Sequence, residues 1–117
     1  MIVDDHAPSR VAIRDLLGEL AGAVCECTSG EEAVSRCEEF KPDFVTLGLK
    51  LTAMNGLESA QVILARWSTE IVLVTESVSA ELRRAAIRVG ATGCFSKNNL
   101  AALRRHFETA SHGTGQA

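Results

Sequence analysis

Acidic, hydroxyl and ammonium side chains occur at points along this chain where short apolar segments end. Asp4 and Asp5 form an acidic pair near the start, and Thr75 and Lys97 each close a later apolar segment. Clustered carboxylates suit a hard cation such as Mg²⁺, which takes oxygen ligands and keeps several waters. A lysine ammonium pairs with carboxylate or phosphoryl oxygens. Together these groups suit transfer of a phosphoryl group to a carboxylate, which depends mostly on positioning and charge neutralisation.

The elements that must position these residues follow from the apolar pattern, which switches repeatedly between strand-like and helix-like. Strands are expected at 2–3, 23–27, 44–49, 71–75 and 92–96. Helices are expected at 8–22, 29–41 and 57–67, from Ser77 or Ser79 to Val89, and from Asn98 or Asn99 onward. The alternation predicts a single α/β domain with a doubly wound, five-stranded parallel sheet and helices on both faces. Ligands of such sheets bind beyond the carboxyl ends of the strands. The residues expected there are Asp4, Asp5, Gly48, Thr75 and Lys97.

Each of these residues also has an ordinary structural explanation. An Asp-Asp pair after a short apolar run is usually a turn or a helix cap. Thr75 is a good strand residue, and a residue such as Lys97 is most often a solvated surface charge. The functional interpretation therefore depends on their combination and spacing.

The combination resembles the receiver domain of two-component response regulators, the CheY-like family, over nearly the whole chain. The segments that carry the resemblance are Ile2–His6, Pro42–Val45, Met54–Gly56, Thr75 and Gly90–Lys97. The resemblance implies a flavodoxin-like receiver fold and a role in a two-component or phosphorelay pathway. Its expected partners are a histidine kinase and an output domain or protein.

The resemblance also implies roles for the residues at the strand ends. Asp5 would be a direct Mg²⁺ ligand, the backbone carbonyl of Lys50 would be another, and Asp4 would act through water. Thr75 and Lys97 would contact the phosphoryl group as the switch residues.

Gly48 stands where this family has the aspartate that is phosphorylated. A glycine can neither form an acyl phosphate nor give a metal a carboxylate, so Mg²⁺ is not required and should bind weakly. Asp43 lies five residues upstream, near the other end of the strand at about 3.3 Å per residue. The unactivated hydroxyl of Thr46 is a poor acceptor. Cys94 replaces the aromatic switch residue, and Thr52 stands where proline is usual.

The leading interpretation is a non-enzymatic pseudo-receiver, degenerate at Gly48, that acts by phosphorylation-independent protein–protein interaction. The alternative is an ordinary phosphate-accepting receiver, for example from a DNA-binding response regulator, whose acceptor was changed to glycine. The further departures at Thr52 and Cys94 favour natural degeneracy. A small metal-dependent α/β enzyme is a remote alternative, because no nucleophile stands near the acidic pair and Lys97.

Composition excludes several other classes of protein. The 117 residues carry a net charge of −3 without a basic tract, which argues against nucleic-acid binding by this domain. No apolar run approaches the roughly 20 residues that span a bilayer. The early acidic pair also interrupts any hydrophobic targeting core, so a cytoplasmic protein is expected. The four cysteines match no zinc or redox spacing and are expected to be buried thiols.

Arginine pairs mark the last two predicted helices, at Arg83-Arg84 and Arg104-Arg105. A solvated face is the ordinary explanation. By the resemblance, the face built from the fourth helix, the last strand and the last helix would be a partner or homodimer surface. The receiver is expected to span 1–110. Residues 111–117 are polar and are expected to form a disordered tail or the start of a linker.

Overall fold

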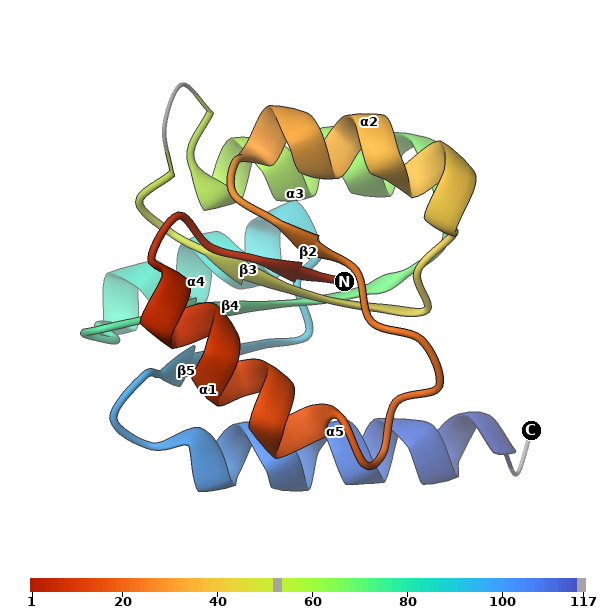
Figure 1. The fold of residues 1–117 in the computed structure, drawn as a ribbon. Helices are drawn as coiled ribbons and strands as arrows, with labels where there is room; N and C mark the ends of the chain where they lie inside the picture. The colour runs from red at the N-terminus through yellow and green to blue at the C-terminus, as the bar shows by residue number, and fades with distance from the viewer. Residues whose placement is uncertain (52–53, 116–117) are drawn as a thin grey trace.

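A computed structural model of the chain describes residues 1–51 and 54–115. In these residues five strands alternate with five helices: β1 (Ile2–Val3), α1 (Ala7–Leu17), β2 (Glu26–Cys27), α2 (Gly30–Phe40), β3 (Phe44–Gly48), α3 (Gly56–Arg66), β4 (Glu70–Thr75), α4 (Ala80–Val89), β5 (Gly93–Ser96) and α5 (Leu100–Gly115). The strands form one parallel sheet in the order β2-β1-β3-β4-β5. Helices α1 and α5 cover one face, and α2, α3 and α4 cover the other (Figure 1). The predicted doubly wound α/β fold is therefore confirmed.

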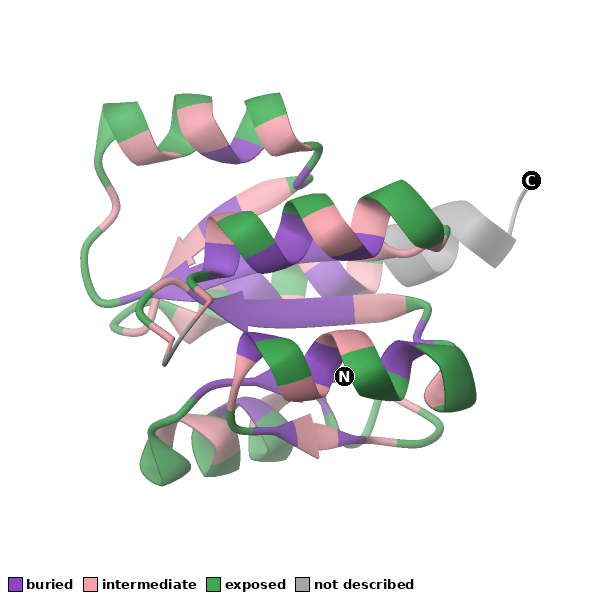
Figure 2. Ribbon diagram, turned by 90° about the horizontal axis from the view of Figure 1, so that it is seen from above, coloured by how far each residue is buried: buried purple, intermediate pink, exposed green. Residues whose placement is uncertain are grey.

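Strand β4 lies in the middle of the hydrophobic core. Ile71 and Leu73 belong to the cluster under α2, α3 and α4, whereas Val72 and Val74 belong to the cluster under α1 and α5. Successive strand residues point to opposite faces, so a strand that is covered on both sides must be apolar at every position. Figure 2 shows this burial along the central strands, with exposed residues on the outer faces of the helices.

Side-chain caps fix where three helices begin. Ser29, Asn55 and Ser79 each accept a hydrogen bond from the backbone N–H three residues later, at 2.9 to 3.1 Å. Such caps satisfy N–H groups that have no partner inside the helix. At its other end α4 stops at Gly90, which has a φ of 99°, a conformation that glycine adopts without steric cost. The caps confirm the predicted starts of α2 and α3 and select Ser79 over Ser77 for α4.

Helix α1 differs from the prediction in length and in the residues that it buries. It ends at Leu17 and not near Gly22. Val11 and Leu20 continue the apolar pattern of the predicted helix, yet they are 56% and 40% exposed. The buried residues are Ile13 and Leu17, which share one helix face because they are four residues apart. Val11 is two residues from Ile13, about 200° around the helix, and Leu20 lies beyond the helix end.

Two predicted boundaries also change. Strand β2 takes only Glu26–Cys27 of the predicted strand at 23–27, because it pairs with the two-residue strand β1. Helix α5 continues to Gly115, so a helix replaces the first five residues of the tail expected at 111–117. The last two residues of that tail lie outside the described residues, as does Thr52.

The cysteines are buried free thiols, as predicted. Burial raises the pKa of the Cys27 thiol to about 12 and also raises the pKa of Cys37 and of Cys94. A thiol reacts and binds metals as its thiolate, so these side chains act as small apolar groups at neutral pH. Separately, none of the described helices is both long and apolar enough to cross a membrane.

Candidate functional site

A hollow of about 440 Å³ opens at the carboxyl end of the sheet. The residues predicted for the site that line it are Asp4, Asp5, Gly48, Lys50, Thr75 and Lys97. His6, Glu76 and Ser77 complete the polar part of its wall. The fold therefore brings together the predicted residues from the ends of three strands and from the segment after β5. Cys94 is the exception.

An ion pair joins Asp4 to Lys97 across the hollow. The Lys97 Nζ atom lies 2.9 Å from Asp4 Oδ2, and Asp4 is only 2% exposed. The other oxygen, Oδ1, accepts a hydrogen bond of 2.9 Å from the backbone N–H of His6. Oδ2 has no hydrogen-bond partner of good geometry among the described residues, so the lysine compensates its charge as an ion pair without a directed hydrogen bond. Of the two adjacent aspartates, Asp4 is thus the one that pairs with Lys97.

Asp5 and Thr75 leave their polar atoms open to the hollow. Asp5 is exposed and has no ion pair within the described part of the chain. Thr75 is buried at the end of β4, and its backbone carbonyl accepts a hydrogen bond of 2.7 Å from the Lys97 N–H. This bond fixes the backbone of Lys97 beside β4. The Thr75 hydroxyl has no hydrogen-bond partner among the described residues.

Gly48 ends β3 directly beside the acidic pair. A Cβ atom at this position would lie 3.3 Å from Asp4 Oδ2 and 3.4 Å from Leu51 Cδ2. A side chain here would therefore point at Asp4. Thr46 is buried inside the sheet, and Asp43 lines a separate groove near the start of β3. Neither residue supplies an oxygen nucleophile at the position of Gly48.

The hollow holds part of the oxygen ligand set that the resemblance implies for Mg²⁺. Mg²⁺ takes near-octahedral oxygen coordination and is usually bound through carboxylates. The Asp5 carboxylate and Lys50 line the hollow, but Lys97 already occupies one oxygen of Asp4. Within the described ranges, no three His, Cys, Asp or Glu side chains are grouped so that they could hold a metal ion. The groups present that could hold Mg²⁺ are therefore the Asp5 carboxylate and the backbone at Lys50, without a carboxylate at position 48.

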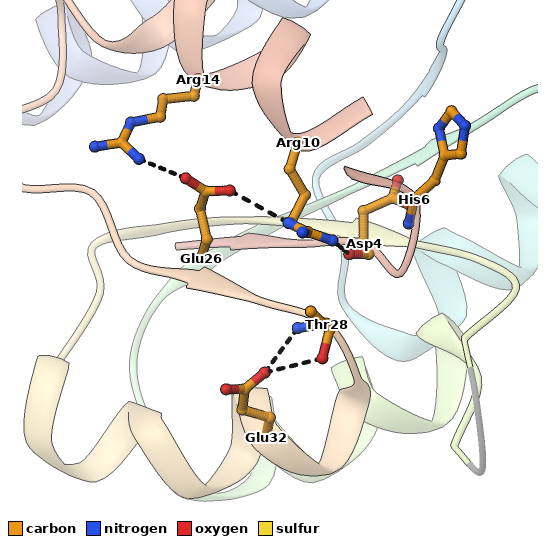
Figure 3. A network of polar contacts seen from close by, with 7 residues as sticks. All are labelled: Asp4, His6, Arg10, Arg14, Glu26, Thr28 and Glu32. Atoms are coloured by element: carbon orange, nitrogen blue, oxygen red, sulfur yellow. Dashed lines mark hydrogen bonds and ion pairs between the residues drawn. The ribbon is translucent and has the colours of Figure 1, made fainter. Parts of the chain in front are cut away.

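Arg10 supports the site, although the sequence pattern did not indicate it. Its Nη1 atom donates a hydrogen bond of 2.7 Å to the backbone carbonyl of Asp4, and its Nε atom lies 3.2 Å from Glu26 Oε1 (Figure 3). Arg14 contacts the other oxygen of Glu26 at 2.5 Å. The network ties Asp4 to α1 and to β2. The available signal was the spacing of four residues between the two arginines, which places both on one helix face.

Cys94 does not reach the hollow. It is buried in the core cluster under α2, α3 and α4. Phe95, the next residue, packs against the cluster under α1 and α5, with its ring centroid 5.1 Å from that of His106. Cys94 and Phe95 therefore lie on opposite faces of the sheet, as successive strand residues do. Phe95 therefore cannot substitute for an aromatic switch residue at position 94, because its side chain lies on the opposite face of the sheet.

Comparison with known proteins places this chain among signalling proteins. Residues 1–108 match the response regulator receiver domain. The chain is 30% identical over 100 residues to the response regulator GacA of Pseudomonas viridiflava, a match that covers 83% of this chain and 47% of that protein. It is 29% identical over 100 residues to a protein-glutamate methylesterase/protein-glutamine glutaminase of Archaeoglobus fulgidus, covering 83% of this chain and 29% of that protein. The chain thus spans less than half the length of either relative.

A solved structure agrees with these matches. The two-component response regulator of the LuxR family from Aurantimonas sp. SI85-9A1 has a TM-score of 0.86 and 27% identity to this chain. The similarity covers 97% of this chain and 84% of that one. Because the matched residues include every strand and the hollow at the strand ends, the chain belongs to the family of response regulator receiver domains.

Proposed function

We propose that this chain is a receiver domain that signals through protein–protein contacts without taking up a phosphoryl group. The observation that carries the proposal is Gly48, which ends β3 beside Asp4 and offers no oxygen nucleophile. Covalent phosphoryl transfer to a protein needs such a nucleophile. The chain itself is non-enzymatic in this proposal.

The ion pair between Lys97 and Asp4 gives the pocket one preferred arrangement without phosphate. Lys97 is held at Asp4 Oδ2 by charge and beside β4 by its backbone hydrogen bond to Thr75. Without a third carboxylate, repulsion among the acidic groups is smaller than three acids would produce. In this proposal, partner binding depends on the outer surfaces and not on a phosphoryl-driven switch of Thr75 and Lys97.

We expect the mass of the chain to stay unchanged after incubation with phosphoramidate and Mg²⁺. Intact-mass spectrometry measures this directly, and Gly48→Asp supplies the positive control. A phosphoryl adduct on the unsubstituted chain that maps to the hollow would overturn the proposal. An adduct elsewhere on the surface would appear equally in a Lys97→Met chain and would not count as receiver chemistry.

Magnesium should bind this chain at least about tenfold more weakly than it binds Gly48→Asp, because the substitution adds an anionic oxygen ligand beside Asp5. Amide NMR titration with Mg²⁺ measures both affinities, using shifts of Asp5, Lys50 and Thr75. Gly48→Asn is the matched control, because it adds similar volume without the charge. Equal affinities for the unsubstituted chain and Gly48→Asp would mean that Asp5 and the Lys50 carbonyl are sufficient, with Asp4 contributing through water.

An ordinary phosphate-accepting receiver whose acceptor was changed to glycine is the second candidate. The observation that favours it is the hollow, which retains Asp4, Asp5, Thr75 and Lys97 around the position of Gly48. The coding sequence of the source gene decides between the two, since only a natural glycine codon fits the first.

The partner surface in this proposal is the face of α4, β5 and α5, with a histidine kinase, an output domain or a second copy as its partner. Arg83, Arg84 and Arg105 are exposed on the two helices. A cytoplasmic location fits these partners, and no nucleic-acid contact by this domain is proposed.

A further inference from the structure

Two helices at opposite edges of one layer carry opposite charge. Helices α2 and α4 flank α3 on the same face of the sheet, as Figure 2 shows from above. The charged residues of α2 are Glu31, Glu32, Arg36, Glu38 and Glu39, four acids and one base. Those of α4 are Glu81, Arg83, Arg84 and Arg88, three bases and one acid. One edge of the layer is therefore acidic and the other is basic.

The basic edge has an apolar residue at its centre. Ile87 is 72% exposed, the most exposed large hydrophobic residue in the described part of the chain. Arg83, Arg84 and Arg88 are exposed around it at spacings of −4, −3 and +1. None of the three arginines forms an ion pair with a described residue. A single exposed isoleucine is ordinary. An exposed isoleucine surrounded by three arginines without ion-pair partners among the described residues is a surface suited to an acidic partner with an apolar groove.

The acidic edge has a matching hollow. A groove of about 300 Å³ lies between α2 and α3, and its apolar wall includes Val34, Met54 and Trp67. Glu31 and Glu38 are exposed along the α2 side of this groove. Neither is ion-paired to a described residue. The one base that lines the groove is Arg66, whose guanidinium lies 4.4 Å from the centre of the Trp67 ring at the α3 side.

We propose that copies of this chain associate head to tail, with α4 of one copy docked on the α2–α3 groove of the next. Ile87 enters the groove, where burial removes its apolar surface from water. The arginines that frame it face Glu31 and Glu38 of the neighbouring copy, which gives the contact its orientation. Because the two surfaces differ, the contact is heterologous and generates a ring or an open filament of copies.

This contact is distinct from an isologous dimer through α4, β5 and α5. It uses α2 and α3 on the second copy, which an isologous contact through α4, β5 and α5 does not. It also requires no phosphoryl group, so it stands whether or not Gly48 blocks phosphorylation. Substitution at Glu38 distinguishes the two kinds of contact, because only the head-to-tail contact involves this residue.

Sedimentation velocity over a concentration series at low ionic strength tests the proposal. The unsubstituted chain should show a sedimentation coefficient that rises with concentration, and less so at high salt because surface charges are screened. Arg84→Glu and Glu38→Arg should each weaken self-association about tenfold or more, since each places like charges opposite one another. Both substitutions in one chain should restore association, because the charges are then exchanged across the same contact.

Folding does not limit these variants. Arg84→Glu replaces a like-charged pair with Arg88 at i,i+4 by an oppositely charged pair, which favours the helix. Circular dichroism checks that each variant is folded. Arg105→Glu, the same charge change at an exposed site on α5, is the matched control and should leave association unchanged.

Three results would overturn the proposal. The first is a chain that stays monomeric throughout the concentration series. The second is a doubly substituted chain that is folded but does not recover association. The third is loss of association in Arg84→Glu and Arg105→Glu but not in Glu38→Arg, which would assign the contact to the face of α4, β5 and α5.

Discussion

Replacing Gly48 with aspartate is expected to give a chain that takes up a phosphoryl group from phosphoramidate in the presence of Mg²⁺, whereas the unsubstituted chain takes up none. The new Cβ would lie 3.3 Å from Asp4 Oδ2 and 3.4 Å from Leu51 Cδ2. These contacts are tight, but both neighbours end in side-chain atoms that can shift by a few tenths of an ångström. The carboxylate then enters the hollow beside Lys97 and Thr75.

The chemistry expected of Gly48→Asp is a displacement at phosphorus. A carboxylate oxygen attacks the phosphorus atom of phosphoramidate, the P–N bond breaks, and ammonia leaves with a proton from solvent. The Lys97 ammonium and the Thr75 hydroxyl are placed to stabilise negative charge on the transferred group, because both line the same hollow. Lys97 must loosen its ion pair with Asp4 to do so.

Intact-mass spectrometry measures the uptake, and peptide mapping locates it. Gly48→Asn is the matched control, because an amide of nearly the same size cannot form the acyl phosphate. If Gly48→Asp is folded and still takes up nothing, the pocket has lost more than its acceptor. The view of this chain as an ordinary receiver with one changed residue would then be untenable.

The backbone around Gly48 is itself closely packed, and Gly56→Ala is expected to destabilise the chain by about 2–3 kcal/mol. A Cβ on Gly56 would overlap the carbonyl oxygen of Gly48 and lie 3.1 Å from the Leu49 Cα, and both of these are backbone atoms. Gly22→Ala is the control, because its Cβ would meet no atom within 4 Å. Urea unfolding should show a change of less than about 1 kcal/mol for the control. Equal stability of the two variants would mean that α3 moves freely away from β3.

The residues at the strand ends could be predicted from the sequence, because a parallel sheet leaves few alternative positions for them. Thr75 closes a run that is apolar at every position, which is the pattern of a strand covered on both faces. Once five such segments alternate with helices, their carboxyl ends must meet at one edge of the sheet. The positions of Gly48 and Lys97 in the hollow followed from the same rule.

The predictions that were wrong or missing concern contacts between elements that are distant in the sequence. The face that α1 buries is set by its contact with α5 and the sheet, so the apolar Val11 could be exposed while Ile13 is buried. The length of β2 was limited by its short partner β1. Arg10 reaches the Asp4 carbonyl from a different element, a contact that sequence spacing alone does not reveal.

The choice of Asp4 over Asp5 as the partner of Lys97 is likewise a matter of burial. Two adjacent aspartates are equivalent in the sequence, but Asp4 continues the line of β1 into the interior and Asp5 turns toward solvent. A buried carboxylate gains more from a nearby ammonium than an exposed one does, because water no longer screens the pair.

Lys97→Met should therefore lower the free energy of unfolding by about 3 kcal/mol, the low end of the range for removing one partner of a buried ion pair. The low end applies because the Lys97 side chain is 23% exposed, so part of its charge is already solvated. Methionine retains much of the apolar stem, so the loss reports the charge and not the packing. Urea unfolding measures the change, and Lys50→Met, at an exposed position, should shift stability by less than about 0.5 kcal/mol.

A double-mutant cycle with Asp4→Asn separates the ion pair from other effects of Lys97. If the pair is responsible, Lys97→Met should cost much less in the Asp4→Asn background, because no buried carboxylate is then left uncompensated. An equal cost in both backgrounds would mean that Lys97 stabilises the chain through its apolar stem and its place beside Thr75, and not through the ion pair.

The coupling energy from this cycle also estimates the free energy that holds Lys97 at Asp4. The ion pair must be broken before Lys97 can contact a phosphoryl group. A strong ion pair would therefore slow the uptake of a phosphoryl group by Gly48→Asp, compared with a pocket in which Lys97 is already free.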